Sequence, residues 1–151
     1  MDKKLRKFLD ENKIKYKISE HKKVYTAFNE AETQHMKAKE IAKVVLVKTD
    51  KDYALVVVPA TKYIDFAKTK KSLEAKKVSM AKESDITKIL KSKIGLIHPF
   101  GNLYKLAVLL DNSLAKQKTL KSSAGSYTES LEVKTSDFMK LVQPIKGSFS
   151  K

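Results

Sequence analysis

Two apolar, β-branched runs separated by a short polar turn constrain the fold of this chain most strongly. The runs are residues 41–48 and 53–59, and the four residues between them are Thr49-Asp50-Lys51-Asp52. Apolar runs of this length, bounded by turn residues, predict a β-hairpin. Residues 104–111 are also strongly apolar, and we expect a further strand there. The sequence therefore predicts a sheet built around this hairpin.

Helical and extended patterns alternate irregularly along the rest of the chain. Apolar spacing predicts helices over 2–12, 26–36, 66–75, 83–91 and 135–142. Strands are predicted over 15–20, 77–81, 118–122 and 131–134, with a turn at 124–127 and a loop at 95–102. With no repeat and no linker, this order favours one domain of mixed α/β class, with a largely antiparallel sheet and peripheral helices, over a doubly wound fold.

The chain is strongly basic, with 32 Lys and Arg against 17 Asp and Glu and a net charge of +15. Such a surface favours polyanions, because each phosphate contact adds salt-dependent affinity. Only Arg6 is an arginine, and sequence-specific base reading depends largely on bidentate arginine. We therefore expect contacts to a nucleic-acid backbone, and no DNA partner; a lysine-rich proteome would give the same charge without any such role.

Several classes of function are disfavoured by what the sequence lacks. It contains no cysteine, which excludes a disulfide scaffold, a thiolate nucleophile and a cysteine-rich zinc site. Its four glycines are too scattered for a dinucleotide-binding or phosphate-binding loop. Its three histidines, at 21, 35 and 98, lack metal-ligand spacing, and no G-x-S-x-G elbow supports a serine triad. No targeting or membrane-spanning pattern appears, so we expect a cytoplasmic protein without a membrane partner.

Four segments carry a more specific pattern. They are Glu20-His21 with Val24-Tyr25-Thr26; residues 41–47 around Lys43; the loop Gly95-Leu96-Ile97-His98-Pro99-Phe100-Gly101; and residues 108–114, which include Asp111, followed by a small-residue turn at 122–126. In this order and spacing they resemble the YbaK/ProX family of aminoacyl-tRNA deacylases, which is related to the editing insertion of bacterial prolyl-tRNA synthetases. The resemblance covers roughly residues 5–143.

This resemblance implies both a fold and an activity. The fold would be a compact α/β domain over residues 1–143 with a curved, barrel-like sheet, followed by a polar tail at 144–151. The activity would be freestanding trans-editing: hydrolysis of the ester between a wrong, small amino acid, such as alanine on proline tRNA, and its tRNA. The substrate hydroxyl and water would supply much of the chemistry, without a cofactor or metal. The partners would be mischarged tRNA, contacted at its backbone and acceptor end, and an aminoacyl-tRNA synthetase.

Three residues are the candidate catalytic groups. Lys43, a cation at the edge of an apolar strand, could hold a phosphate or the terminal adenosine and so orient the ester. Gly95 lets the backbone approach a ligand and Pro99 fixes the loop, whose N–H groups could polarise the ester carbonyl. Without the resemblance, these features would be a surface lysine and an ordinary turn.

The resemblance also implies a set of substrate-binding residues: His21, Thr26, Ile97, His98, Ser123, Gly125 and Ser130. Thr26 could equally be a helix N-cap. His98 stands where the family more often has a small residue, and it either contacts substrate and assists proton transfer or packs within its loop. Asp111 either orders the loops or contacts substrate, and we favour the structural role.

Departures from the family pattern leave specificity open. Some bacterial members that act on cysteinyl-tRNA carry Tyr, Thr and Asp where this chain has Ser19, Val44 and Ser130, whereas Val24-Tyr25-Thr26 resembles alanine-type members. These departures motivate an alternative, a non-catalytic tRNA- or synthetase-binding module on the same fold. A third hypothesis is a small-molecule hydrolase on this scaffold.

Overall fold

The predicted hairpin forms the centre of the structure, a computed structural model that describes residues 1–20 and 41–151. Strands β2 (Ala42–Thr49) and β3 (Tyr53–Pro59) pair antiparallel from Ala42–Pro59 to Lys48–Tyr53. The N–H of Thr49 donates to the carbonyl of Asp52 at 2.7 Å, and the Thr49 hydroxyl oxygen accepts from the Lys51 and Asp52 amides. The polar turn thus closes on its own backbone and fixes the register of the two strands.

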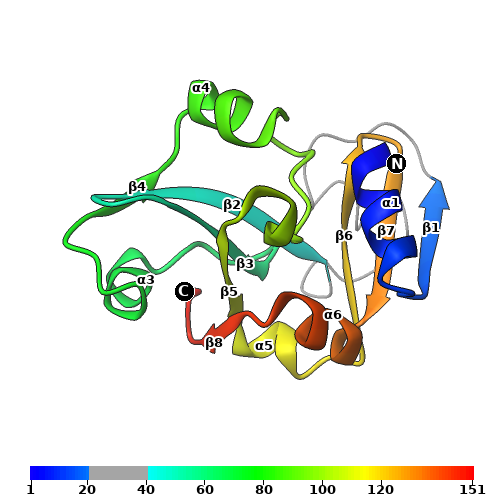
Figure 1. The fold of residues 1–151 in the computed structure, drawn as a ribbon. Helices are drawn as coiled ribbons and strands as arrows, with labels where there is room; N and C mark the ends of the chain where they lie inside the picture. Colours follow the sequence, from blue (N-terminus) through cyan, green and yellow to red (C-terminus); the bar gives the residue numbers. More distant parts are fainter. Residues whose placement is uncertain (21–40) are drawn as a thin grey trace.

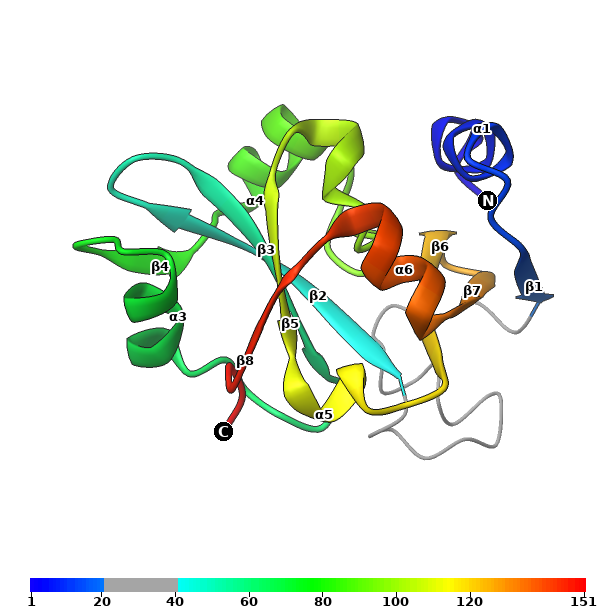
Figure 2. The same cartoon turned by 60° about the horizontal axis from the view of Figure 1, so that its bottom comes forward.

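The hairpin belongs to a five-stranded sheet with the order β4-β2-β3-β5-β8, where β4 is Val78–Met80, β5 is Ala107–Asp111 and β8 is Ile145–Gly147. β4 and β3 pair antiparallel to β2, whereas β5 pairs parallel to both β3 and β8. β3 crosses the middle of the sheet (Figure 2) and is buried along residues 54–59. Burial on both faces explains why its sequence is continuously apolar rather than alternating.

A second, three-stranded antiparallel sheet has the order β1-β7-β6, where β1 is Tyr16–Glu20, β6 is Thr119–Ser126 and β7 is Glu129–Lys134. Helix α1 (Lys3–Glu11) lies beside this sheet (Figure 1) and buries Leu5 and Leu9. Its N-cap Asp2 accepts hydrogen bonds from the N–H groups of Lys4 and Leu5. A parallel bridge between Ile41 and Lys121 joins the two sheets just before β2 begins.

Short helices complete the fold. They are α3 (Phe66–Ser72), α4 (Glu83–Asp85), which continues into the π-helical segment Ile86–Leu90, α5 (Asn112–Ala115) and α6 (Thr135–Val142). A 3₁₀ turn spans Gly101–Tyr104. The helix predicted over 26–36 lies outside the described residues. In the part of the chain that is described, no helix is long and apolar enough to cross a membrane.

Two clusters of buried side chains hold these layers together. The larger one joins α1 and the three-stranded sheet to one face of the five-stranded sheet, and Phe100 and Phe138 lie within it. The smaller one covers the opposite face and consists of Val47, Ala54, Val56, Val58, Ile64, Leu109 and Phe149. Full burial of an apolar side chain of this size stabilises the folded state by about 1.5–3 kcal/mol.

The C-terminal residues differ from the polar tail that the sequence predicts. β8 lies at the edge of the five-stranded sheet, and Phe149 is only 1% exposed. The N–H of Tyr63 donates to the carbonyl of Lys151 at 3.0 Å, and the N–H of Lys151 donates back at 2.8 Å. Between them, Ile64 and Ser150 form an antiparallel bridge. Residues 149–151 are therefore packed against residues 63–65.

The predicted fold class is confirmed: the domain is mixed α/β, with more antiparallel than parallel strand pairs. The strands do not close into one barrel, because they divide into two sheets. The predicted turn at 124–127 is wrong in its bounds, since β6 continues to Ser126 and β7 begins at Glu129. β5 begins at Ala107 rather than at 104, because the 3₁₀ turn precedes it.

Candidate functional site

Lys43 lies near the start of β2, opposite Val58. Its ammonium donates to the carbonyl oxygen of Lys62 at 2.6 Å and lies 5.5 Å from the centroid of the Tyr63 ring. Burial lowers the pKa of Lys43 from its usual value, because the charged form loses solvent. An ammonium that is held in place and partly dehydrated attracts an anion more strongly than a fully solvated lysine does.

The groups that hold Lys43 come from the segment after β3. Tyr63 is fixed by its paired backbone hydrogen bonds with Lys151, and the N–H of Asp65 donates to the Phe149 carbonyl at 2.8 Å. Lys62 and Tyr63 were not among the predicted site residues; the group of Lys62 that binds Lys43 is a main-chain carbonyl, which has no sequence signal. The available signal was Tyr63 itself, an aromatic residue close after an apolar strand, which proves to be 75% exposed.

The Gly95–Pro99 loop has one exposed and one buried end. Gly95 is exposed and has a φ of 87°, a conformation that favours glycine. At the other end Ile97, Pro99 and Phe100 are buried, and Ile97 and Phe100 belong to the same apolar cluster as Ala42 of β2. Packing therefore fixes the loop on the face of β2 to which Ala42 points, whereas Lys43, the next residue, points to the other face with Val45 and Val47.

His98 is packed inside this loop, with only 2% of the residue exposed. The N–H of Phe100 donates to its Nδ1 at 3.3 Å, and its Nε2 lies 3.1 Å from the hydroxyl oxygen of Tyr104, whose ring stacks on it. Since Nδ1 accepts a hydrogen bond, the proton of the neutral ring is assigned to Nε2, which donates to Tyr104.

Burial also sets the charge states of this pair. It lowers the pKa of His98 from 6.5 to about 4, against a smaller opposite effect of Asp2. It also raises the pKa of Tyr104 to about 12. Both side chains are therefore neutral near pH 7. Of the two roles that the sequence left open for His98, this placement favours packing within the loop.

Small side chains form a row across the three-stranded sheet. Ser130 of β7 pairs with Ser123 of β6 on one side and with Ser19 of β1 on the other, and it is 3% exposed. Paired residues of antiparallel strands direct their side chains to one face. Two residues beyond the Ile41–Lys121 bridge, in the same chain direction, are Lys43 and Ser123. Ser123, the β6 member of this row, and Lys43 are therefore equally far along their strands from the bridge that joins the two sheets.

Gly125 lies near the N-terminus of α1 rather than at the bridge between the sheets. Its φ is 86°, and a β-carbon there would lie 2.8 Å from the β-carbon of Asp2. The N–H of Asp2 donates to the carbonyl of Ala124 at 3.0 Å. Gly125 thus permits the close approach of the chain's first residues to β6.

Asp111 serves the packing of residues 147–149. Its carboxylate accepts from the N–H of Phe149 at 2.8 Å and from the N–H and hydroxyl of Ser113, which makes it the N-cap of α5. Burial alone would raise the pKa of Asp111, but these hydrogen bonds outweigh it and lower the pKa. The structural role that the sequence favoured for Asp111 agrees with this arrangement.

Two of the predicted site residues, His21 and Thr26, lie outside the described residues. Within residues 1–20 and 41–151, no group of three or more His, Asp or Glu side chains could hold a metal ion. The structure thus relates Lys43 and the serine row through the bridge between β2 and β6. The Gly95–Pro99 loop packs on the face of the five-stranded sheet opposite to the one that the Lys43 side chain shares with Val45 and Val47.

Comparison with known proteins identifies the family. The model of the aminoacyl-tRNA editing domain matches residues 21–141. A hypothetical protein shares the fold with a TM-score of 0.91 and 16% identity, over 99% of this chain and 100% of that one. A scaffold protein from computational epitope grafting matches with a TM-score of 0.86 and 15% identity, over 100% and 99% of the two chains.

A protein described as a candidate trans-editing enzyme for prolyl-tRNA synthetase matches with a TM-score of 0.85 and 16% identity, over 100% of this chain and 99% of that one. At such identities these structures establish the fold alone, whereas the family model covers most of the sequence. The chain therefore belongs to the aminoacyl-tRNA editing domain family and has an editing role that involves tRNA.

Proposed function

We propose that this chain is a trans-editing deacylase, which hydrolyses the ester between a small amino acid and the tRNA that wrongly carries it. The observation that carries the proposal is the placement of Lys43. Its ammonium is anchored by the Lys62 carbonyl, partly dehydrated, and located at the junction of the two sheets. A fixed cation of this kind can hold an anionic or polar part of the acceptor end.

The proposed reaction is hydrolysis. Water attacks the carbonyl carbon of the ester, the bond from this carbon to the ribose oxygen breaks, and the ribose oxygen takes a proton. The products are the free amino acid and the uncharged tRNA. In this proposal Lys43 holds the terminal phosphate or adenosine, and N–H groups of the Gly95–Pro99 loop polarise the carbonyl. The N–H groups of Leu96 and Phe100 already donate to the Lys93 carbonyl and to His98 Nδ1, so they are not the donors. His98 acts as a positioning residue, because its hydrogen bonds hold the buried end of that loop.

The serine row supports a small amino acid as the substrate. Ser19, Ser123 and Ser130 have short side chains, and Ser130 is nearly fully buried. Alanine on proline tRNA is the first substrate to test, because a structural neighbour is described as a candidate trans-editing enzyme for prolyl-tRNA synthetase. One methylene contributes only about 1–3 kcal/mol of discrimination, so a panel of substrates is needed. The net charge of +15 suits a tRNA substrate, and we include a synthetase among the proposed partners.

The test is deacylation of a panel of mischarged tRNAs, beginning with alanine on proline tRNA. Lys43→Ala is compared with Lys48→Ala, a matched change at an exposed position of the same strand. We expect Lys43→Ala to lose hydrolysis while it keeps its circular dichroism spectrum, and Lys48→Ala to behave as the parent. Normal cleavage by Lys43→Ala would show that the proposed site is wrong.

A second candidate function is a tRNA- or synthetase-binding module without catalysis. The specific observation in its favour is that His98, where the family more often has a small residue, is packed and neutral. This alternative predicts salt-sensitive binding of tRNA with no turnover on any member of the panel. Multiple turnovers above the spontaneous rate of ester hydrolysis would exclude it.

A further inference from the structure

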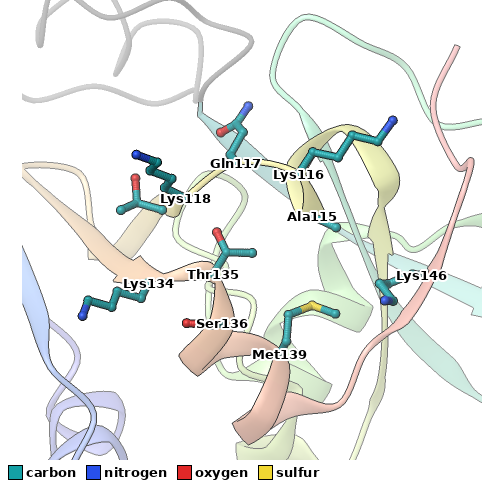
Figure 3. A pocket seen from close by; sticks show the side chains of 10 residues that line it. Ala115, Lys116, Gln117, Lys118, Lys134, Thr135, Ser136, Met139 and Lys146 are labelled. Atoms are coloured by element: carbon teal, nitrogen blue, oxygen red, sulfur yellow. The ribbon is translucent and has the colours of Figure 1, made fainter.

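A groove outside the Lys43 site opens between α5, α6 and the adjoining strand ends (Figure 3). Its volume is about 730 Å³. It is lined by Ala115, Lys116, Gln117, Lys118, Thr119, Lys134, Thr135, Ser136, Met139 and Lys146. These residues come from the end of α5, the start of β6, the end of β7, the first turns of α6, and β8.

The groove has a strong positive charge. Lys116, Lys118, Lys134 and Lys146 are all exposed, and no carboxylate is among the lining residues. None of the ion pairs within the described ranges involves these four lysines. Two acidic residues are close in sequence, Glu132, which pairs with Lys121, and Asp137 in the first turn of α6, and neither lines the groove. Four unneutralised ammonium groups around one groove favour an anionic ligand.

The N-terminus of α6 opens into the same groove. Its N-cap residue, Lys134, makes no side-chain capping hydrogen bond. The first N–H groups of a helix have no intrahelical acceptor and carry partial positive charge. One of them, the N–H of Thr135, donates to the carbonyl of Lys118 at 2.9 Å. The N–H groups that follow it in the first turn have no acceptor within the helix, which is the setting in which helix N-termini bind anions.

Thr135 provides an independent sign of a missing ligand. Only 5% of the residue is exposed, its side chain lines the groove (Figure 3), and its hydroxyl has no hydrogen-bond partner within the described residues. A buried hydroxyl without a partner is unfavourable and therefore uncommon. Because the hydroxyl oxygen has almost no exposed surface, an oxygen of a bound anion would accept its hydrogen bond after the Thr135 side chain rotates about χ1 toward the groove.

We propose that this groove binds phosphate groups of an RNA backbone, and so docks the body of the tRNA whose acceptor end reaches Lys43. The proposal deepens the proposed function and rests on it for the identity of the polyanion. Its chemistry fits a phosphodiester: lysines act as mobile point charges, while the hydroxyl and the helix N–H groups donate hydrogen bonds. Without arginine in the groove, binding is expected to be independent of RNA sequence.

The first test measures affinity for uncharged tRNA, which requires no hydrolysis. Lys118→Gln with Lys134→Gln is compared with Lys70→Gln with Lys71→Gln, an equal change of charge at exposed positions of α3. Each lost phosphate contact lowers the slope of log K against log salt by about 1. Between about 50 and 200 mM KCl, the Kd of the parent should thus rise about 16-fold more than that of the groove variant. The control variant should keep most of the parent slope.

The second test uses Thr135→Val, which keeps the shape of the side chain and removes the hydroxyl. We expect its unfolding midpoint to stay the same or rise, because the unpartnered group is gone. Its tRNA affinity should fall at least about threefold, by the loss of one hydrogen bond to phosphate. A merely structural Thr135 would change stability without changing affinity.

The outcomes separate this proposal from the proposed function. Equal tRNA affinity of the groove and control variants, or no tRNA binding by the parent at about 50 mM salt, would overturn the groove proposal. The groove proposal would also be overturned if the groove of the parent bound inorganic phosphate in an NMR titration but the groove variants kept the full RNA affinity of the parent. Absence of deacylation with groove-dependent tRNA binding would refute only the deacylase.

Discussion

The burial of His98 leads to a quantitative prediction about acid stability. The folded chain binds a proton on this ring only near pH 4, whereas the unfolded chain binds it near the ordinary value of 6.5. Between these values the unfolded state carries the extra proton, so the free energy of unfolding falls as the pH falls. Above pH 6.5 the group has no effect on the pH dependence, and below pH 4 the loss is complete.

The magnitude follows from the two pKa values. A pKa difference of one between the folded and unfolded chain is worth about 1.4 kcal/mol, so the complete loss is about 3 kcal/mol, of which about 2 kcal/mol is lost by pH 5. For a domain whose stability is about 5–15 kcal/mol, this is a large fraction. His98 alone should therefore make the protein markedly acid-sensitive.

The assay is urea unfolding followed by circular dichroism from about pH 7.5 to 4.5, with His98→Asn beside the parent. The substituted amide side chain can still accept from the Phe100 N–H, but it does not titrate and loses the Tyr104 stack. We expect the variant to be less stable by about 1–3 kcal/mol at pH 7.5, and the difference to shrink by about 2 kcal/mol at pH 5. The other titrating groups contribute equally to the pH dependence of the two proteins, so their contribution cancels in the difference in unfolding free energy. Parallel curves for parent and variant would refute the reasoning.

Three further predictions concern other residues. Burial lowers the pKa of Lys43, so enzyme-dependent deacylation should decline, as the pH rises, at a lower pH than for an ordinary lysine. If Lys43→Arg is active, it should lack this decline, because arginine stays charged. A pH profile corrected for spontaneous hydrolysis tests both expectations. Gly125→Ala should cost about 1–3 kcal/mol in urea unfolding, because of its positive φ and the close Asp2 β-carbon; a cost below about 0.5 kcal/mol would contradict this. Asp111→Asn should cost about 1–3 kcal/mol and speed amide exchange at Phe149; unchanged exchange there would contradict the hydrogen bond.

The spacing of apolar and turn residues within a segment was sufficient to predict the helices and strands that bury a face or run of their own. The β2–β3 hairpin, α1 and α6 follow from apolar spacing and turn residues, and the structure has them within a few residues of the predicted bounds. The predicted mixed α/β class is likewise confirmed. These elements can be recognised from the sequence because each buries a continuous stripe or run of apolar side chains.

The errors arise where long-range pairing decides the structure. Nothing local in residues 144–151 predicts a strand, and β8 forms because the edge of β5 is available and Phe149 enters the smaller cluster. The anchor of Lys43 is likewise a main-chain carbonyl from another segment. The burial of His98 depends on the Tyr104 ring and on Phe100, and sequence reasoning could only leave its two roles open.

The pairing of residues 149–151 with residues 63–65 has a consequence for synthesis. Chains are made from the N-terminus, and local units such as the β2–β3 hairpin can form early. The segment that anchors Lys43 gains its partners, Phe149 and Lys151, only after the rest of the domain has been translated. We therefore expect the surroundings of Lys43 to be completed last as the chain is made, after the β2–β3 hairpin that carries this residue has formed.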